Sequence, residues 1–341
     1  MKKLFLLLLV FLSNLSFAQV EVKVDHRIEA VSIFYAMAIG RDSLDIKPTP
    51  SIYLKEFDEY FKPYKNHKSL NWYRNLEKWD AADVSTIGLY LTEAYPFKLK
   101  IPYEGHYLQS SKIEDFINHL NSFYKDCNVS KFIKRHQKLY KKTSLFALDT
   151  IIKSDVLKET QKFFKAETND KFIIYIDLLN NHTSNSIEIK EYKNCRQFKL
   201  AYLSSENPNS ANEESIKFVP AFNVVIHECS HLYVSDFISA NYDRLFKIKN
   251  KFLTKPNGKI LPENRWQDEL DEMLVRVCVA KILGNKYGSE SEQSEIENQS
   301  IGYLHFKGLH QFITEKIEKN PNYNSFKDFY PDLVLFLGNL K

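Results

Sequence analysis

Apolar residues recur at intervals of three and four along several segments of the chain, which is the spacing of a helix buried on one face. In "SSKIEDFINHLNSFYKDC", 110–127, Glu114 stands where the acid of a capping box lies if Ser111 is the N-cap. We predict a helix here. Its buried face would consist of Ile113, Phe116, Ile117, Leu120 and Phe123.

Three short segments in the middle of the chain have the composition of strands. They are rich in Ile, Tyr and Leu and are separated by Asn, Ser and Thr: "KFIIYIDLL" (171–179), "SIEIKEY" (186–192) and "FKLAYLSS" (198–205). A sheet formed from them would offer an edge to which an extended peptide can add as a further strand.

Helical patterns return after these strands. The segments "NRWQDELDEMLVRVCVAKILG" (264–284), "SIGYLHFKGLHQFITEKIEK" (300–319) and "DFYPDLVLFLGNL" (328–340) predict helices, whereas the polar run 284–300 predicts a loop. The predicted fold class is therefore α+β, predominantly helical.

The domain organisation follows from composition. Hydrophobic residues make up 44% of the 341 residues, which is ample for a sizeable core, while the scarcity of Gly (9) and Pro (11) argues against a linker. We expect one large domain or two lobes. The prediction is a single domain over 19–341, with a helical part at about 19–165, a sheet with helices at about 170–285 and a helical part at about 300–341.

The first 18 residues have the layout of a secretory signal. Lys2 and Lys3 precede an apolar run from Leu4 to Leu12, and cleavage after Ala18 would follow a stretch that ends in small residues. The run is far shorter than the roughly 20 residues of a spanning helix. We therefore expect a protein exported to the periplasm or beyond the cell, without stable membrane insertion.

The net charge and the cysteines limit the possible partners and the possible kinds of site. The formal net charge is only +4, and it falls further when the two leader lysines are removed. Charges of both signs are scattered along the chain, so no nucleic-acid or anionic-membrane partner is indicated. The four cysteines are too few for a disulfide scaffold and are not spaced as zinc ligands. Cys127 with Cys195 is the only disulfide we consider.

The segment "FNVVIHECSHLYV", 222–234, carries two histidines and a glutamate among uncharged, mostly apolar residues. After Pro220, which suits a first helical turn, His227 and His231 would share one face and Glu228 would lie beside it. Burying such a trio is costly unless something satisfies it, and a metal ion does. Histidines that are hydrogen-bonded at a helix surface are the alternative.

The rest of this predicted helix forms a wide apolar back face. That face would comprise Phe222, Val225, Ile226, Cys229, Leu232 and Tyr233. Cys229 therefore points away from the histidines, and we interpret it as a buried structural thiol rather than a nucleophile.

A catalytic zinc site needs a third protein ligand and an open position for water. In the helix predicted at 264–284 we favour Glu272, with Arg276 one turn later to orient it or to contact a substrate. Glu269 is the alternative ligand, and an ordinary intrahelical ion pair between Glu272 and Arg276 is the alternative interpretation.

"VVIHECSHLYV" followed some forty residues later by "DEMLVRV" resembles the gluzincin branch of the zincin metallopeptidases. The resemblance implies a zincin-like fold in which His227 and His231 are zinc ligands, Glu228 is the general base and Glu272 is the third ligand. Arg276 is a departure, because the best-known gluzincins carry an aspartate there.

A second resemblance covers most of the chain after the leader. The segments "INHLNSFYKDCNVSKFIKRHQKLY", "KFIIYIDLLNN" and "NYNSFKDFYPDLV" are similar to a family of exported bacterial proteins known only as a domain of unknown function. That family is itself similar to metallopeptidases and has no assigned substrate.

These features predict a zinc metallopeptidase that hydrolyses peptide bonds of a peptide or protein substrate with a metal-activated water. The candidates for stabilising the oxyanion are Arg276, Tyr303, His305 and His310. Two alternatives stay open. One is a zinc hydrolase of non-peptide amides, and the other is an exported, non-catalytic binding protein with a structural metal.

Overall fold

The computed structural model describes residues 20–40, 52–76, 84–104, 108–166, 170–179, 184–192, 195–201, 221–318 and 323–340. These residues are mostly helical with one small mixed sheet of four strands, which confirms the predicted α+β class. The predicted signal at 1–18 and Pro220 lie outside the described residues. Within the described part, no helix combines the length and the apolar character needed to span a membrane.

The chain divides into two compact units. Of the described residues, those within Val20–Ser154 and Ile173–Ala221 form the sheet unit, and those within Asp155–Phe172 and Phe222–Lys341 form the motif unit. The single domain expected over 19–341 stays an expectation.

The sheet unit takes its name from strands β1 (Val20–Lys23), β2 (Lys171–Asp177), β3 (Asn185–Ile187) and β4 (Cys195–Ala201), in the order β1-β2-β4-β3. Strands β3 and β4 are antiparallel, with Ser186 opposite Phe198. The three strands predicted from composition are confirmed as β2, β3 and β4, whereas β1 was missed because four residues carry too little pattern. The prediction that a peptide adds at an edge, β1 or β3, stays untested.

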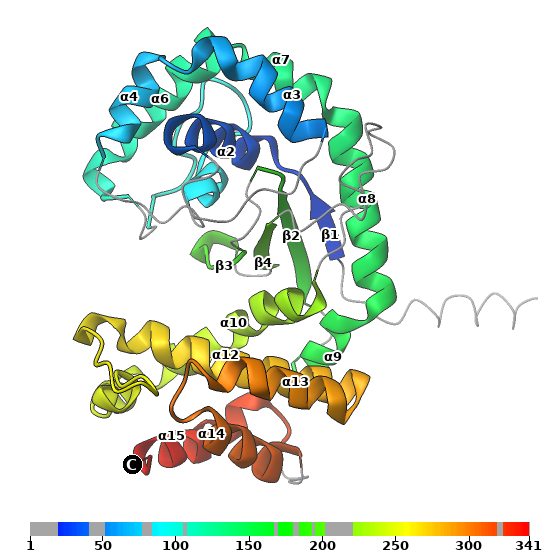
Figure 1. Cartoon of the computed structure of the whole chain (residues 1–341), viewed down its shortest axis with the longest axis vertical. Coiled ribbons are helices and arrows are strands. Elements are labelled where there is room, and N and C mark those ends of the chain that lie inside the picture. Colours follow the sequence, from blue (N-terminus) through cyan, green and yellow to red (C-terminus); the bar gives the residue numbers. More distant parts are fainter. Residues whose placement is uncertain are drawn as a thin grey trace, which may run out of the picture. The chain divides into compact units, whose positions relative to one another are not determined.

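Among its described residues this unit also has helices α2 (His26–Ile39), α3 (Ile52–Phe61), α4 (Lys68–Arg74), α6 (Ile113–Asp126), α7 (Val129–Arg135) and α8 (Gln137–Ser154). Helix α8 runs along β1 (Figure 1). An aromatic cluster forms the core, in which the ring of Phe34 contacts those of Tyr73, Phe116 and Phe123.

The helix predicted at 110–127 is α6, and all five of its predicted core residues are buried. Its start differs from the prediction. A 3₁₀ turn, Ser110–Lys112, precedes it, and Lys112 is the N-cap without a side-chain hydrogen bond, so the capping box of Ser111 and Glu114 is not formed.

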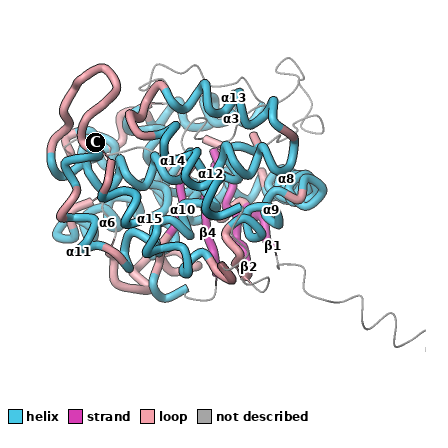
Figure 2. Tube along the Cα trace, turned by 90° about the horizontal axis from the view of Figure 1, so that it is seen from below, coloured by secondary structure: helices cyan, strands magenta, loops and turns pink. Residues whose placement is uncertain are grey.

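The motif unit is helical: α9 (Val156–Phe163), α10 (Phe222–Ala240), α11 (Tyr242–Phe246), α12 (Trp266–Tyr287), α13 (Ser289–Ser300), α14 (Phe306–Ile313) and α15 (Tyr330–Gly338). Helix α12 is its centre, because it packs against α9, α10, α13 and α14. It runs beside α10 in both views (Figures 1 and 2). The predicted helices at 264–284, 300–319 and 328–340 correspond to α12, α14 and α15.

The predicted loop at 284–300 is wrong, because Ser289–Ser300 is helix α13. This helix has no buried residue and is held by polar contacts instead. Glu292 accepts hydrogen bonds from Lys281 of α12 and from His310 of α14. Gly284 of α12 makes room for it, since a Cβ there would meet the Glu292 side chain at 2.5 Å.

Cys127 and Cys195 are both free cysteines, so the Cys127–Cys195 disulfide considered above is not formed. Cys127 is buried at the end of α6, whereas Cys195 is half-buried at the start of β4. Cys229 is fully buried, as its place on the back face of the motif helix predicted.

Candidate metal centre

Helix α10 carries the two histidines on one face. His227 and His231 lie four residues apart, one helical turn, and their Nε2 atoms are 3.0 Å from each other. On the opposite face Val225, Ile226, Cys229, Leu232 and Tyr233 are buried, and Phe222 is half-buried. The predicted division into a histidine face and an apolar back face is thus confirmed.

Helix α12 brings a carboxylate to the same point. Oε2 of Glu272 lies 3.7 Å from Nε2 of His227, and Oε1 lies 3.6 Å from Nε2 of His231. Ligand atoms about 2.1 Å from one ion at tetrahedral angles lie roughly 3.4 Å apart, so these separations suit a common zinc ion. Within the described residues, His227, His231 and Glu272 are the group of possible metal ligands.

Asp271, which the sequence analysis did not single out, holds the other nitrogen of His231. Its Oδ2 lies 2.6 Å from Nδ1, which leaves Nε2 directed at His227 and Glu272. Carboxylates at this place fix the ring and the tautomer of metal-binding histidines. The available signal was its position beside Glu272 in "LDEM", but only the rotation of α12 against α10 shows which histidine it reaches.

Arg276 contacts the oxygen of Glu272 that also faces His227. Its Nε donates to Oε2 of Glu272 over 3.0 Å, and its Nη1 donates to Oε1 of Gln299 on α13. The ring of Tyr303 lies 5.7 Å from the guanidinium carbon. The pair of Glu272 and Arg276 is therefore an intrahelical ion pair that two further elements also contact.

Charges in this cluster are strongly coupled. Burial lowers the pKa of His227. Burial acts in the same direction on His231, but the hydrogen bond to and the charge of Asp271 raise the pKa of His231 to about 9. The raised pKa favours the protonated form of His231, in which Nδ1 donates to Asp271.

The carboxyl of Glu272 is ionised in this setting. Burial opposes ionisation, but the contact with His227 and the charges of His231 and Arg276 lower the pKa of Glu272 to about 2. A permanent carboxylate beside two imidazole nitrogens is a donor set that suits zinc.

Glu228, the predicted general base, is 5% exposed and lies on α10 directly after His227. Its negative charge contributes to the raised pKa of His231. The carboxylate is therefore buried within electrostatic reach of His231.

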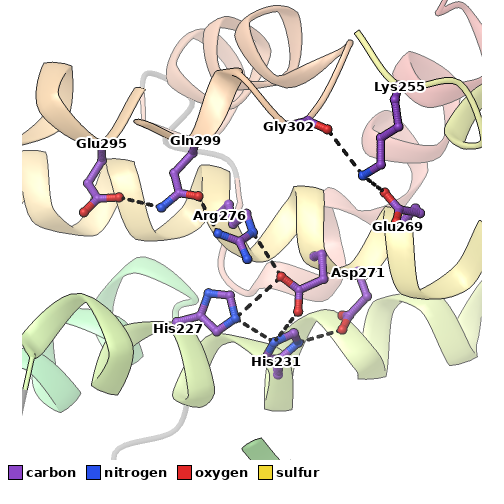
Figure 3. Close-up of polar contacts among 10 residues, drawn as sticks. His227, His231, Lys255, Glu269, Asp271, Arg276, Glu295, Gln299 and Gly302 are labelled. Atoms are coloured by element: carbon purple, nitrogen blue, oxygen red, sulfur yellow. Dashed lines mark hydrogen bonds and ion pairs between the residues drawn. The ribbon is translucent and has the colours of Figure 1, made fainter. Parts of the chain in front are cut away.

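Glu269, the alternative ligand, is engaged elsewhere. It pairs with Lys255 (Figure 3). The ammonium of Lys255 also lies 4.5 Å from the ring of Tyr303. Glu269, Lys255 and Tyr303 line a pocket beside α12. Glu272, and not Glu269, thus belongs to the cluster of ligand atoms in the described residues.

The other polar candidates separate into two groups. Tyr303 contacts Arg276, and burial raises the pKa of its hydroxyl to about 12, so it stays protonated at neutral pH. His305 lies 3.2 Å from the carbonyl oxygen of Lys251, and His310 lies 2.8 Å from Glu292. Neither of these two contacts reaches His227, His231 or Glu272.

Comparisons of the chain with protein-family models, with curated proteins and with solved structures find no match. The chemistry of the centre is therefore argued from its own residues.

Proposed function

We propose that the protein is a zinc-dependent metallopeptidase that hydrolyses peptide bonds, as an exported enzyme with a zincin-like, gluzincin-type centre. The observation that carries the proposal is the convergence of His227, His231 and Glu272 from two packed helices, with Glu228 beside them. Three protein ligands are typical of catalytic zinc, whereas structural zinc usually has four. The set of three within the described residues favours hydrolysis over a structural metal.

Zinc bound here would acidify a water molecule and polarise a carbonyl group of the substrate. Glu228 would accept the proton from that water and pass it to the leaving amine, which requires an ionised, positioned carboxylate. Asp271 would hold the His231 ring, and Arg276 would hold the Glu272 carboxylate. Tyr303, protonated and next to Arg276, is the best-placed candidate to donate a hydrogen bond to developing negative charge.

The test begins with the metal content of the protein without its leader. We expect about one zinc per chain in wild type and in Glu228→Gln, and a sharp reduction in His231→Ala and Glu272→Ala. Glu269→Ala is the matched control, because it removes a neighbouring carboxylate of α12 outside the cluster and should leave the zinc in place.

Activity is then measured on a library of unstructured peptides. Wild type should cleave some of them, and Glu228→Gln, with its zinc retained, should lose at least about 100-fold in kcat because the proton acceptor is gone. Equal cleavage by Glu228→Gln and wild type would contradict the proposal, as would a wild-type protein that binds no zinc after reconstitution.

A further inference from the structure

A chain of polar contacts connects helix α13 to the candidate metal centre. Glu295 accepts a hydrogen bond from Nε2 of Gln299 over 3.1 Å, and Gln299 accepts one from Arg276. Figure 3 shows Glu295, Gln299 and Arg276 in this order, and Arg276 in turn donates to Glu272. At the far end, Nδ2 of Asn223 lies 3.5 Å from Oε1 of Glu295. Asn223 and His227 are four apart on α10, so the chain of contacts links the helix that carries the two histidines, through α13, to Glu272 of α12.

The face of α13 that makes these contacts is unusual for a packed helix. Glu292, Glu295 and Gln299 follow one another at intervals of three and four, so they share one face. A helix normally packs through an apolar stripe, and polar contacts contribute little stability because they replace contacts with water. Polar contacts are more directional than apolar ones, so this face favours positioning over stability.

Arg276 is the side chain that needs such positioning. A free arginine loses up to about 2 kcal/mol of side-chain entropy when it is fixed, so a single contact with Glu272 would hold it loosely. Gln299 fixes its Nη1 while Nε contacts Oε2 of Glu272, and Oε1 of Glu272 faces His231. The geometry of the guanidinium thus selects which oxygen of Glu272 faces which histidine.

We infer that Gln299, held by Glu295, is a positioning residue of the metal centre, which orients Glu272 through Arg276 and thereby raises the affinity for zinc. The inference rests on the proposed zinc site. It adds α13 to that site although α13 supplies no ligand.

The first experiment removes the contact without changing the size of the side chain. Gln299→Met should weaken zinc binding about 10- to 100-fold, the range found when outer partners of metal ligands are removed. The matched control is Gln293→Met on the same helix, because Gln293 is exposed and contacts only Glu297 in the described residues. Zinc affinity is measured by competition with a chelator.

Two additional readouts separate positioning from folding. The melting temperature of the zinc-free Gln299→Met variant should stay near that of wild type, and the absorption spectrum of the cobalt-substituted protein should change because the ligand geometry does. Unchanged zinc affinity and an unchanged cobalt spectrum in folded Gln299→Met would overturn the inference.

A double variant keeps the test decisive if Gln299→Met does not fold. Glu295→Gln with Gln299→Glu exchanges the two side chains. The carboxylate at residue 299 can then still accept from Arg276, and the amide at residue 295 can donate to that carboxylate. The net charge is unchanged. We expect zinc affinity within about threefold of wild type. A folded double variant as weak as Arg276→Met would overturn the inference.

The proposed function and this inference fail in different ways. If wild type binds no zinc, both are wrong. If wild type binds zinc and Gln299→Met binds it as tightly, the metal centre stands and the role of α13 is wrong.

Discussion

His231 is the residue at which protonation and metal binding compete. Its pKa is raised to about 9 through Asp271, and zinc can bind Nε2 only after that proton has left. We therefore expect the apparent zinc affinity to rise about tenfold per pH unit as the pH increases toward about 9, and to level off above it. Chelator competition at several pH values measures this.

Asp271→Asn tests the cause. Removal of the negative charge should lower the pKa of His231, so the zinc affinity should level off at a lower pH. The zinc affinity at the plateau should be about tenfold weaker, because the ring is less basic and less well held. The pKa of His231 is followed by NMR in the zinc-free protein. A variant with the pH profile of wild type would show that Asp271 does not control this proton.

Glu29 is a second residue whose charge state depends on the tertiary structure. It is fully buried in the sheet unit, where Tyr53 donates a hydrogen bond to it. Burial raises its pKa to about 8, and the charge of Asp177, which faces it and is paired with Lys199, acts in the same direction. The folded chain therefore binds a proton at Glu29 that the unfolded chain releases near the ordinary glutamate pKa of 4.5.

The sign of the pH effect follows from that difference. The stabilisation is fully present below pH 4.5 and is lost as the pH rises to about 8, at up to about 1.4 kcal/mol per pH unit. Glu29→Gln keeps the shape and should remove this contribution. Urea unfolding between pH 5 and about 9 measures it. Parallel profiles for variant and wild type would contradict the assignment.

Close packing between two elements depends on one glycine. Gly88 lies in the 3₁₀ helix Ser85–Tyr90, and a Cβ on it would stand 2.6 Å from the backbone of Arg27 in α2. Gly88→Ala should therefore cost about 1–3 kcal/mol, because backbone cannot move aside cheaply. Gly308→Ala is the control, since a Cβ in α14 meets nothing within 4 Å and should stabilise slightly. Thermal unfolding compares the two, and equal stability would contradict the packing argument.

Helix α13 shows where sequence patterns fail at the scale of elements. The segment 284–300 has no apolar periodicity and therefore predicts a loop, yet Ser289–Ser300 is helical. Its side chains pair four apart, as Gln293 with Glu297 does, and contact α12 and α14. Such contacts depend on neighbours that the local sequence does not specify.

The division into two units gives a prediction for the whole molecule. The three proposed zinc ligands come from α10 and α12, which both belong to the motif unit. Zinc at a hundredfold excess over Kd should therefore raise the free energy of opening of α10 and α12 by about 2.7 kcal/mol, which is measured as slower hydrogen exchange. The exchange of the sheet unit should stay nearly unchanged. His231→Ala should show no effect of zinc. Equal protection of both units would contradict a site confined to one of them.

The sequence by itself determined what depends on local spacing. Periodicity fixes the buried face of α6, and the interval of four places His227 and His231 on one face of α10 with Cys229 on the opposite side. These results need only the repeat of a helix, which is the same wherever the helix lies.

Only the tertiary structure decided which residues of other elements meet that face. Glu269 and Glu272 both lie on the same side of α12, so periodicity cannot choose between them, and their separation along the axis decides which one faces the histidines. The roles of Asp271, Arg276 and Gln299 likewise depend on how α12 and α13 are rotated and shifted against α10. Contacts between helices depend on the packing of whole faces, and a local pattern carries no information on that register.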